Sequence, residues 1–252
     1  VVSSGGTVEV INRGTLLNRF RITSHISVPS HGNRSSFSRS TSYTELRIST
    51  TVTLRADDKK IEFETEVDNQ AEDHRLRVLF PSGIPGDTYI ASQAFCFIER
   101  RRGVTKKGLN SREPESYEKN TSGIVGVRGN EDCLFFIGKN GFHEAGVYPD
   151  GTVSVTMFRG FGHAFHQPKA VTAQLKGKLH FTYALSVSDE ELFNEQLLLS
   201  DKPCTKLCQT PENPSEALLA LDNRDIALSV IKPTEDKSGW IVRLFNPLGK
   251  II

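Results

Sequence analysis

The stretch "IEFETEVDNQAEDHRLRVLFP", residues 61 to 81, contains two segments in which apolar and polar side chains alternate. In the first segment Ile61, Phe63 and Val67 fall on one face, and glutamates occupy the other. Successive side chains of a β-strand point to opposite sides of its sheet, so a period of two is typical of a half-buried strand. The stretch therefore predicts two strands separated by a polar cluster.

The polar cluster between these strands is either an acid/base site or the loop of a hairpin. If the strands pair so that residue numbers sum to 141, Glu66 faces Arg75. Glu64 then faces Arg77. Each opposite-charge pair across two strands stabilises by about 0.2–1 kcal/mol, whereas a short loop does not hold carboxylates at the fixed spacing that catalysis needs. The favoured prediction is an antiparallel hairpin.

Strand patterns recur along most of the chain. Similar runs, mostly bounded by Gly, Pro, Asn or Asp, lie at residues 20–28, 45–55, 124–127, 133–137, 152–158, 179–187, 226–231 and 240–245. Many short strands with such punctuation predict a mainly β fold, a large antiparallel β-sandwich. Two polar stretches, the serine-rich residues 30–43 and residues 100–122, predict long surface loops.

One segment has helical character. "SDEELFNEQLLLS" begins with Ser188 as a candidate N-cap and has Glu191 three residues later, which is the pattern of a capping box. The predicted division of the chain is a main β-sandwich domain at 1–187, a helical connector at 188–215, and terminal strands at 216–252. These last strands either pack on the sandwich or form a small terminal β subdomain. Trp240, which alternates with Val242 and Leu244, is expected in the core.

Composition excludes several classes of partner. The 31 basic and 30 acidic residues leave a net charge of +1, so no global attraction to nucleic acid or to an anionic membrane is expected. No apolar run approaches the roughly 18 residues of a membrane span.

Four cysteines in 252 residues are too sparse for a disulfide framework and predict a reducing, cytoplasmic location. Because the chain begins at Val1 and has one methionine, we expect it to be part of a longer protein.

Four motifs in order resemble a known family. "DNQAEDHRLRVLFP" is followed by "GFHEAGVYPDGTVSVTMFRGFG" at 141–162, "HFTYALSV" at 180–187 and "GWIVRLFNPLGK" at 239–250. Together they are similar to the C-terminal β region of glycoside hydrolase family 38, the α-mannosidases, across roughly residues 45 to 252. The resemblance implies a supersandwich of the galactose-mutarotase-like kind.

The family's chemistry is implied for a part of the protein that this sequence lacks. Family-38 enzymes are retaining α-mannosidases with an Asp nucleophile and a zinc site, both in an N-terminal α/β domain that precedes a helical bundle. This sequence resembles only the last part, so no catalytic residue, metal ligand or cofactor is assigned in it, and zinc is implied for the missing domain. The implied partners are the N-terminal catalytic and helical domains of the same protein and a mannose-containing oligosaccharide.

Two segments supply candidate residues for a substrate cleft. In "RGFGHAFHQP", residues 159–168, Arg159, Phe161 and His163 combine flat rings with polar groups, as sugar-binding surfaces do, although an ordinary Gly-rich loop has the same composition. His143 and Glu144 in "GFHEAG" form a second candidate pair. Neighbouring strand residues face opposite sides, which favours a simple turn there.

Two functions remain open from the sequence. The chain is either the non-catalytic β region of an α-mannosidase, supporting and partly lining its active site, or an independent carbohydrate-binding sandwich without enzymatic activity. A domain that packs against missing neighbours should expose an apolar patch larger than a few hundred Å², whereas a free-standing binding module should not.

Overall fold

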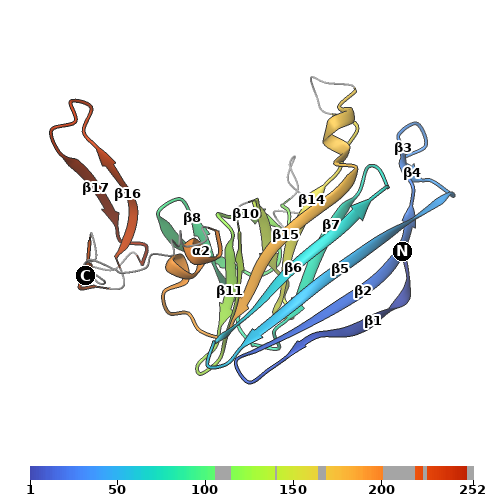
Figure 1. The fold of residues 1–252 in the computed structure, drawn as a ribbon. Coiled ribbons are helices and arrows are strands. Elements are labelled where there is room, and N and C mark those ends of the chain that lie inside the picture. The colour runs from blue at the N-terminus through green and yellow to red at the C-terminus, as the bar shows by residue number, and fades with distance from the viewer. Residues whose placement is uncertain (106–114, 140, 164–168, 201–218, 224–225, 249–252) are drawn as a thin grey trace.

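The computed structural model describes residues 1–105, 115–139, 141–163, 169–200, 219–223 and 226–248. Two antiparallel sheets pack face to face (Figure 1). The larger has nine strands in the order β1 (Val2–Arg13), β2 (Leu17–Pro29), β5 (Tyr43–Arg55), β6 (Lys60–Asn69), β15 (Gly177–Ser186), β12 (Cys133–Gly138), β11 (Ile124–Arg128), β8 (Thr88–Gln93) and β9 (Cys96–Arg101). The smaller has four, β10 (Lys119–Asn120), β13 (Glu144–Val147), β14 (Thr152–Arg159) and β7 (Arg75–Pro81).

The remaining elements are small. Two short hairpins, β3 (Gly32–Asn33) with β4 (Ser38–Arg39) and β16 (Ala227–Pro233) with β17 (Trp240–Phe245), each form a separate two-stranded sheet. The described residues contain a 3-10 turn, η1 (Val171–Gln174), and one α-helix, α2 (Leu192–Ser200). The predicted mainly β sandwich with one short helix is confirmed.

The main core lies between the two sheets. Tyr183 of β15 stacks on Phe63 and Phe136 at ring-centroid distances of 5.1 and 5.3 Å. Phe80 of β7 approaches Phe63 and Phe136 from the opposite sheet, at 6.1 and 6.2 Å. A second cluster holds helix α2 on the other side of the nine-stranded sheet, where Leu192 packs with residues of β11 and β12. The described chain therefore has three layers over its central part.

The predicted hairpin of residues 61–67 with 74–80 is wrong. β6 pairs with β5 on one edge and with β15 on the other, while β7 pairs with β14 in the opposite sheet. Glu66 accordingly lies 3.3 Å from Lys178, and Glu64 lies 3.7 Å from Arg19. The two strands place their apolar faces against each other across the core, because this arrangement buries more apolar area than a side-by-side pair.

Other boundaries also differ from the sequence predictions. Strands β1, β8, β9 and β13 were not predicted, since their apolar residues alternate weakly. The two-residue strands β3, β4 and β10 were not predicted either, because they lie in the polar stretches expected as loops. The capping box at Ser188 is wrong, because α2 begins at Leu192 and Glu191 has a left-handed backbone with φ of 52°. The Ser188 Oγ instead accepts a hydrogen bond from the Glu190 N–H. The three-part division of the chain stays a prediction, and part of its helical connector lies outside the described residues.

The nine-stranded sheet extends well beyond the four-stranded sheet. In register, Val8, Ile22, Thr50 and Thr65 lie side by side on β1, β2, β5 and β6, and the Thr65 hydroxyl reaches the buried Tyr183 hydroxyl at 3.1 Å. Exposure falls along this row from 67% at Val8 and 39% at Ile22 to 4% at Thr65. The face of the sheet that lines the core at β6 is therefore exposed to solvent at β1 and β2. We call this surface the wing face; its residues are Val8, Val10, Phe20, Ile22, Thr50 and Val52.

The C-terminal hairpin projects from the body at the end opposite the wing (Figure 1). Its base is held where the Phe245 ring meets Phe95 and Phe193, at 5.3 and 5.7 Å, and where the Phe97 N–H donates to the Pro247 carbonyl. The expectation that Trp240 belongs to the core is wrong, because 69% of this residue is exposed. An isolated pair of strands has no second layer to cover such a side chain.

Replacement of Phe136 by alanine should lower the free energy of unfolding by about 3–5 kcal/mol, because its ring is fully buried at the centre of the core. Leu79→Ala on the exposed side of β7 is the matched control and should change it by no more than about 0.5 kcal/mol. Urea denaturation followed by circular dichroism measures both. Equal effects would contradict the assignment of Phe136 to the main core.

Candidate functional site

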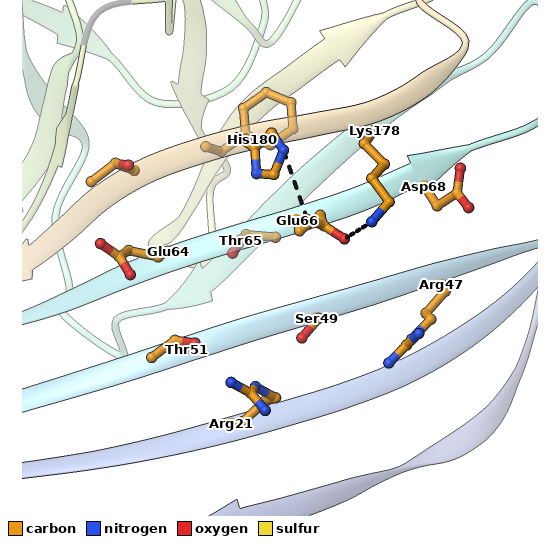
Figure 2. Close-up of a pocket in the computed structure, with 12 residues that line it drawn as sticks. Arg21, Arg47, Ser49, Thr51, Glu64, Thr65, Glu66, Asp68, Lys178 and His180 are labelled. Carbon is orange, nitrogen blue, oxygen red and sulfur yellow. Dashed lines mark ion pairs between the residues drawn. The ribbon is translucent and has the colours of Figure 1, made fainter. Parts of the chain in front are cut away.

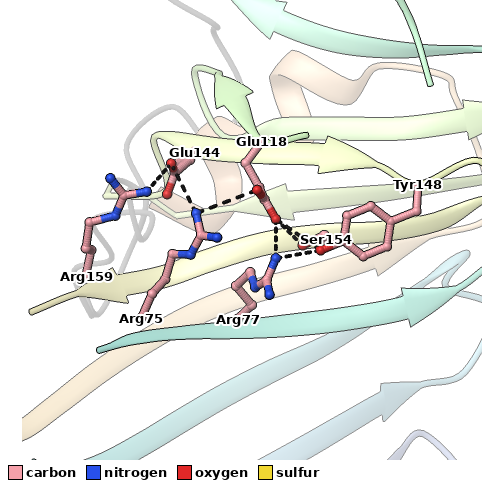
Figure 3. A network of polar contacts seen from close by, with 7 residues as sticks. All are labelled: Arg75, Arg77, Glu118, Glu144, Tyr148, Ser154 and Arg159. Carbon is pink, nitrogen blue, oxygen red and sulfur yellow. Dashed lines mark hydrogen bonds and ion pairs between the residues drawn. The ribbon is translucent and has the colours of Figure 1, made fainter. Parts of the chain in front are cut away.

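A buried glutamate organises the outer side of the four-stranded sheet (Figure 3). The side chain of Glu118 is 3% exposed, and its Oε1 accepts hydrogen bonds from Arg77 at 2.5 Å, Tyr148 at 3.1 Å and Ser154 at 3.2 Å. Arg75 lies 3.6 Å from the other carboxylate oxygen. Arg75 and Arg77 reach Glu118 together because alternate residues of β7 share one face.

The same network extends to the end of β14. Glu144 Oε1 lies 3.5 Å from Arg75 and accepts a hydrogen bond from the half-exposed Arg159 at 2.8 Å. Three guanidinium groups therefore face two carboxylates, an excess of one positive charge at this surface. The most exposed of the three guanidinium groups is that of Arg159, whose N–H groups can donate hydrogen bonds to oxygen acceptors.

The network does not provide a general acid at neutral pH. Burial raises the pKa of Glu118, but the hydrogen bond from Arg77 and the charges of Arg75 and Arg77 outweigh it, so the pKa lies below the ordinary value of 4.5. A carboxylate that stays ionised in this way accepts hydrogen bonds and holds guanidinium groups in place. Its role in the described structure is positioning.

A second polar centre lies where the chain crosses between the sheets. Asp73 Oδ1 accepts hydrogen bonds from the Gly162 N–H and the Gln174 amide, each at 2.9 Å, and Oδ2 accepts one from the Gly32 N–H at 3.4 Å. The Asp73 N–H donates to Gln174 Oε1 at 2.8 Å. We call Asp73, Gly32, Gly162 and Gln174 the Asp73 clamp. Partial burial raises the pKa of Asp73, but these hydrogen bonds lower it further, to below its ordinary value.

The Asp73 clamp forms the floor of a cleft between two loops. One wall is the β3–β4 hairpin, whose tip carries Phe37, and the other is the segment that follows β14, with Phe161 and His163. The volume of this opening is about 600 Å³. We call it the hairpin cleft; its lining residues are Gly32, Asn33, Arg34, Phe37, Asp73, Phe161, Gly162 and His163.

A groove of about 530 Å³ also lies on the outer side of the nine-stranded sheet (Figure 2). Charged side chains of both signs from four neighbouring strands line it, and Glu66 there forms ion pairs with Lys178 at 3.3 Å and His180 at 3.7 Å. Exposed ion pairs of this kind contribute little energy and keep the sheet surface hydrated. The hairpin cleft, with two phenylalanine rings, is the better candidate for a binding site.

The structure divides the five predicted cleft residues into three places. Arg159 and Glu144, predicted from different motifs, meet in the Glu118 network. Phe161 and His163 line the hairpin cleft. His143 is exposed, and its carbonyl accepts a hydrogen bond from the Thr121 N–H. Whether any of these residues lines a substrate cleft stays a prediction.

Several organising residues were missed by sequence reasoning. Arg75 and Arg77 were assigned to β6 glutamates, although their alternation correctly placed them on one face. Glu118 falls in the polar stretch 100–122, which gives no periodic signal. Asp73 and Gln174 are 101 residues apart in the chain, so nothing local indicated their contact.

Among the described residues, no group of three or more His, Cys, Asp or Glu side chains is arranged to hold a metal ion. None of the described helices is long and apolar enough to cross a membrane.

Glu118→Gln should reduce the free energy of unfolding at pH 7 by about 1–3 kcal/mol, because the amide leaves two guanidinium groups poorly paired. The folded-state pKa of Glu118 is depressed, so the carboxylate's contribution is complete above its ordinary pKa of 4.5 and is lost as the pH falls through the folded-state pKa. The difference between wild type and variant should therefore be smaller at a pH well below 4.5 than at pH 7.

Denaturation curves at the two pH values test this expectation. Glu64→Gln is the control, because its ion pair with Arg19 is exposed and spans 3.7 Å, and it should change stability by less than about 1 kcal/mol at either pH. A difference for Glu118→Gln that persisted unchanged in acid would contradict an ionised Glu118.

Comparisons with known proteins agree with this architecture. Two solved Enterococcus faecalis structures, described as a glycosyl hydrolase family 38 protein and as an alpha-mannosidase, match 96% of this chain with TM-scores of 0.73 and 0.80, at 23% identity. These matches show the fold. A curated relative, a putative mannosylglycerate hydrolase of Halalkalibacterium halodurans, is 25% identical over 222 residues, 83% of this chain.

The chain spans only part of each relative. It covers 24% of the length of the curated protein and 30% of each solved chain. Residues 2–129 match the model of the glycosyl hydrolases family 38 C-terminal domain, which is half of the chain. The motif resemblance is thus confirmed, and the chain belongs to glycosyl hydrolase family 38 through its C-terminal domain.

Proposed function

We propose that this chain is the non-catalytic C-terminal β region of a longer retaining α-mannosidase, and that it supports and partly lines an active site formed by the rest of that protein. The nucleophile and zinc site are assigned to the remaining part, as the family resemblance implies. Family membership and the small share of each relative that the chain covers support this proposal.

The wing face is the observation that carries the proposal. Its apolar residues continue the core side of the nine-stranded sheet into solvent, with Val8 67% exposed. Burial of apolar surface stabilises a protein by about 25 cal/mol for each Å² removed from water. A continuous apolar sheet surface is therefore stabilised when another domain packs on it. An independent carbohydrate-binding module, the alternative function, gives no reason for such a surface.

The edge of the four-stranded sheet points to the same neighbour. Within the described residues β7 pairs with β14 alone, and its inner side chain Phe80 lies over Phe63 of β6, next to the wing. The open edge of β7 can pair with another strand, and the apolar wing face beside it can pack against a further domain. We assign this position to the N-terminal catalytic and helical domains of the same longer protein.

The surface at the end of β14 is the proposed contribution to the active site. Arg159, held by Glu144, projects a partly exposed guanidinium group that can bind the hydroxyls of a mannose-containing oligosaccharide. The Glu118 network fixes Glu144 and Arg159 through the shared Arg75. Preorganised groups of this kind bind without losing much conformational freedom.

We also propose a cytoplasmic location. Cys96 and Cys133 are free thiols in the structure, which suits a reducing compartment. A disulfide containing either residue, detected by mass spectrometry in protein isolated under thiol-trapping conditions, would contradict it.

Hydrolysis of an aryl α-mannoside tests the main proposal. This chain alone should be inactive, and activity should appear when it is mixed with the N-terminal part of the longer protein in the presence of zinc. Arg159→Ala in the mixture should lower kcat/KM by about tenfold, the equivalent of one charge-assisted hydrogen bond. Activity of the chain by itself would place the nucleophile in this sequence and overturn the proposal.

Val8→Asp on the wing face should weaken association between the two parts by at least tenfold, because a charge would enter an apolar contact. Thr7→Asp is the control, since Thr7 lies on the opposite side of β1 and is also exposed. Both variants should leave the stability of this chain nearly unchanged. Analytical ultracentrifugation measures the association, and equal affinities for the two variants would exclude the wing face as the contact.

A further inference from the structure

The hairpin cleft has two walls that come from distant parts of the chain and are held by one side chain. Asp73 bonds to Gly32 at the base of the β3–β4 hairpin and to Gly162 in the segment after β14. Arg39 of the same hairpin donates to the Asp73 carbonyl at 2.5 Å. The spacing of the walls is therefore set by the Asp73 clamp before any ligand arrives.

Close packing shows that the clamp is tightly built. A Cβ atom added to Gly162 would lie 2.7 Å from the Gln174 amide nitrogen, and one added to Gly160 would lie 2.9 Å from the Gln174 carbonyl oxygen. Both contacts are shorter than ordinary van der Waals distances, so this segment approaches Gln174 as closely as it does only because it has glycine at these positions.

The hairpin wall is also ordered by its own serine-rich sequence. The Asn33 side-chain oxygen accepts hydrogen bonds from Ser35 and Ser36, and the Ser36 hydroxyl lies 2.7 Å from that of Ser38. These bonds close the turn that presents Phe37. Residues 30–43 were expected as a long surface loop, and the structure instead forms a short hairpin within them.

Phe37 is unusual within this wall. Its residue is 97% exposed and has a left-handed backbone with φ of 50°, a conformation that costs energy for a bulky side chain. Phe161 on the other wall is 40% exposed. Neither exposure nor strain at Phe37 stabilises the isolated chain, whereas two flat apolar faces beside polar groups suit a ligand with both characters.

We propose that the hairpin cleft is a sugar-binding subsite that takes one hexopyranose ring of a mannose-containing oligosaccharide. The C–H face of the ring packs on Phe37 and Phe161. Its hydroxyls face the polar side chains of the cleft, namely Asn33, Arg34 and His163. The identity of the sugar rests on the proposed function, while the shape and chemistry of the cleft stand without it.

Binding of an α-linked mannobiose to this chain tests the inference, measured by isothermal titration calorimetry and by saturation-transfer NMR. Wild type should bind with a dissociation constant on the order of 1 mM, and saturation should transfer to the sugar ring protons. Phe37→Ala should weaken binding about tenfold, and so should Phe161→Ala. The unfolding midpoint of Phe37→Ala should not change, because that ring is almost fully exposed.

Trp240→Ala is the matched control, since it removes another exposed aromatic side chain, on β17 at the opposite end of the molecule (Figure 1). It should bind as wild type does. Absence of mannobiose binding by wild type, or equal binding by wild type and Phe37→Ala, would overturn the subsite. If wild type binds mannobiose but the mixture of the two parts does not hydrolyse the aryl α-mannoside, the subsite stands and the proposed function is rejected. If the mixture hydrolyses the substrate but this chain does not bind mannobiose, the proposed function stands and the subsite is rejected.

Discussion

The crossing of the chain from β6 to β7 is the constraint on which the rest of the structure depends. Between Asn69 and Arg75 the backbone leaves the nine-stranded sheet and enters the four-stranded one. Asp73 has a left-handed backbone there, with φ of 53°, and its carboxylate gathers three donors. Because these donors come from remote segments, one aspartate fixes the crossing and both walls of the hairpin cleft together.

The crossing also determines which surfaces stay open. Once β7 starts the second sheet over β6, no strand of the described part of the chain continues that sheet over β5, β2 and β1, and of these Ile48 of β5 still packs against the main core. Ala71 covers only the end of this region, where it packs on Val28 and Leu46. The apolar wing face and the free edge of β7 are therefore two consequences of one topology.

Charge is distributed over the two sheets in different ways. On the outer side of the nine-stranded sheet, opposite charges alternate in exposed pairs such as Glu66 with Lys178, which are worth little energy each. On the outer side of the four-stranded sheet, Glu118 is buried and contacts Arg75, Arg77 and Ser154, so the ion pairs there belong to a buried network. A buried carboxylate needs all its partners, so this network gives the sheet a fixed polar surface that ends at Arg159.

The sequence by itself determined the strand faces and the class of fold. Alternation in "IEFETEV" placed Phe63 and Val67 on one face and the glutamates on the other, and both residues lie in the main core of the structure. Family motifs then identified the C-terminal domain of glycosyl hydrolase family 38. Both results follow from patterns that are local in the chain.

Only the tertiary structure decided which strands are neighbours and which polar residues meet. A cross-strand pair is worth about 0.2–1 kcal/mol, so Arg75 opposite Glu66 and Arg75 near Glu118 are too close in energy for a local pattern to separate. Burial of whole apolar faces between the sheets contributes far more and overrides such pairs. Contacts such as Asp73 with Gln174 arise from that packing. For this reason the local motif indicated Phe161 and His163 on one wall of the hairpin cleft, but not the hairpin that forms the other wall.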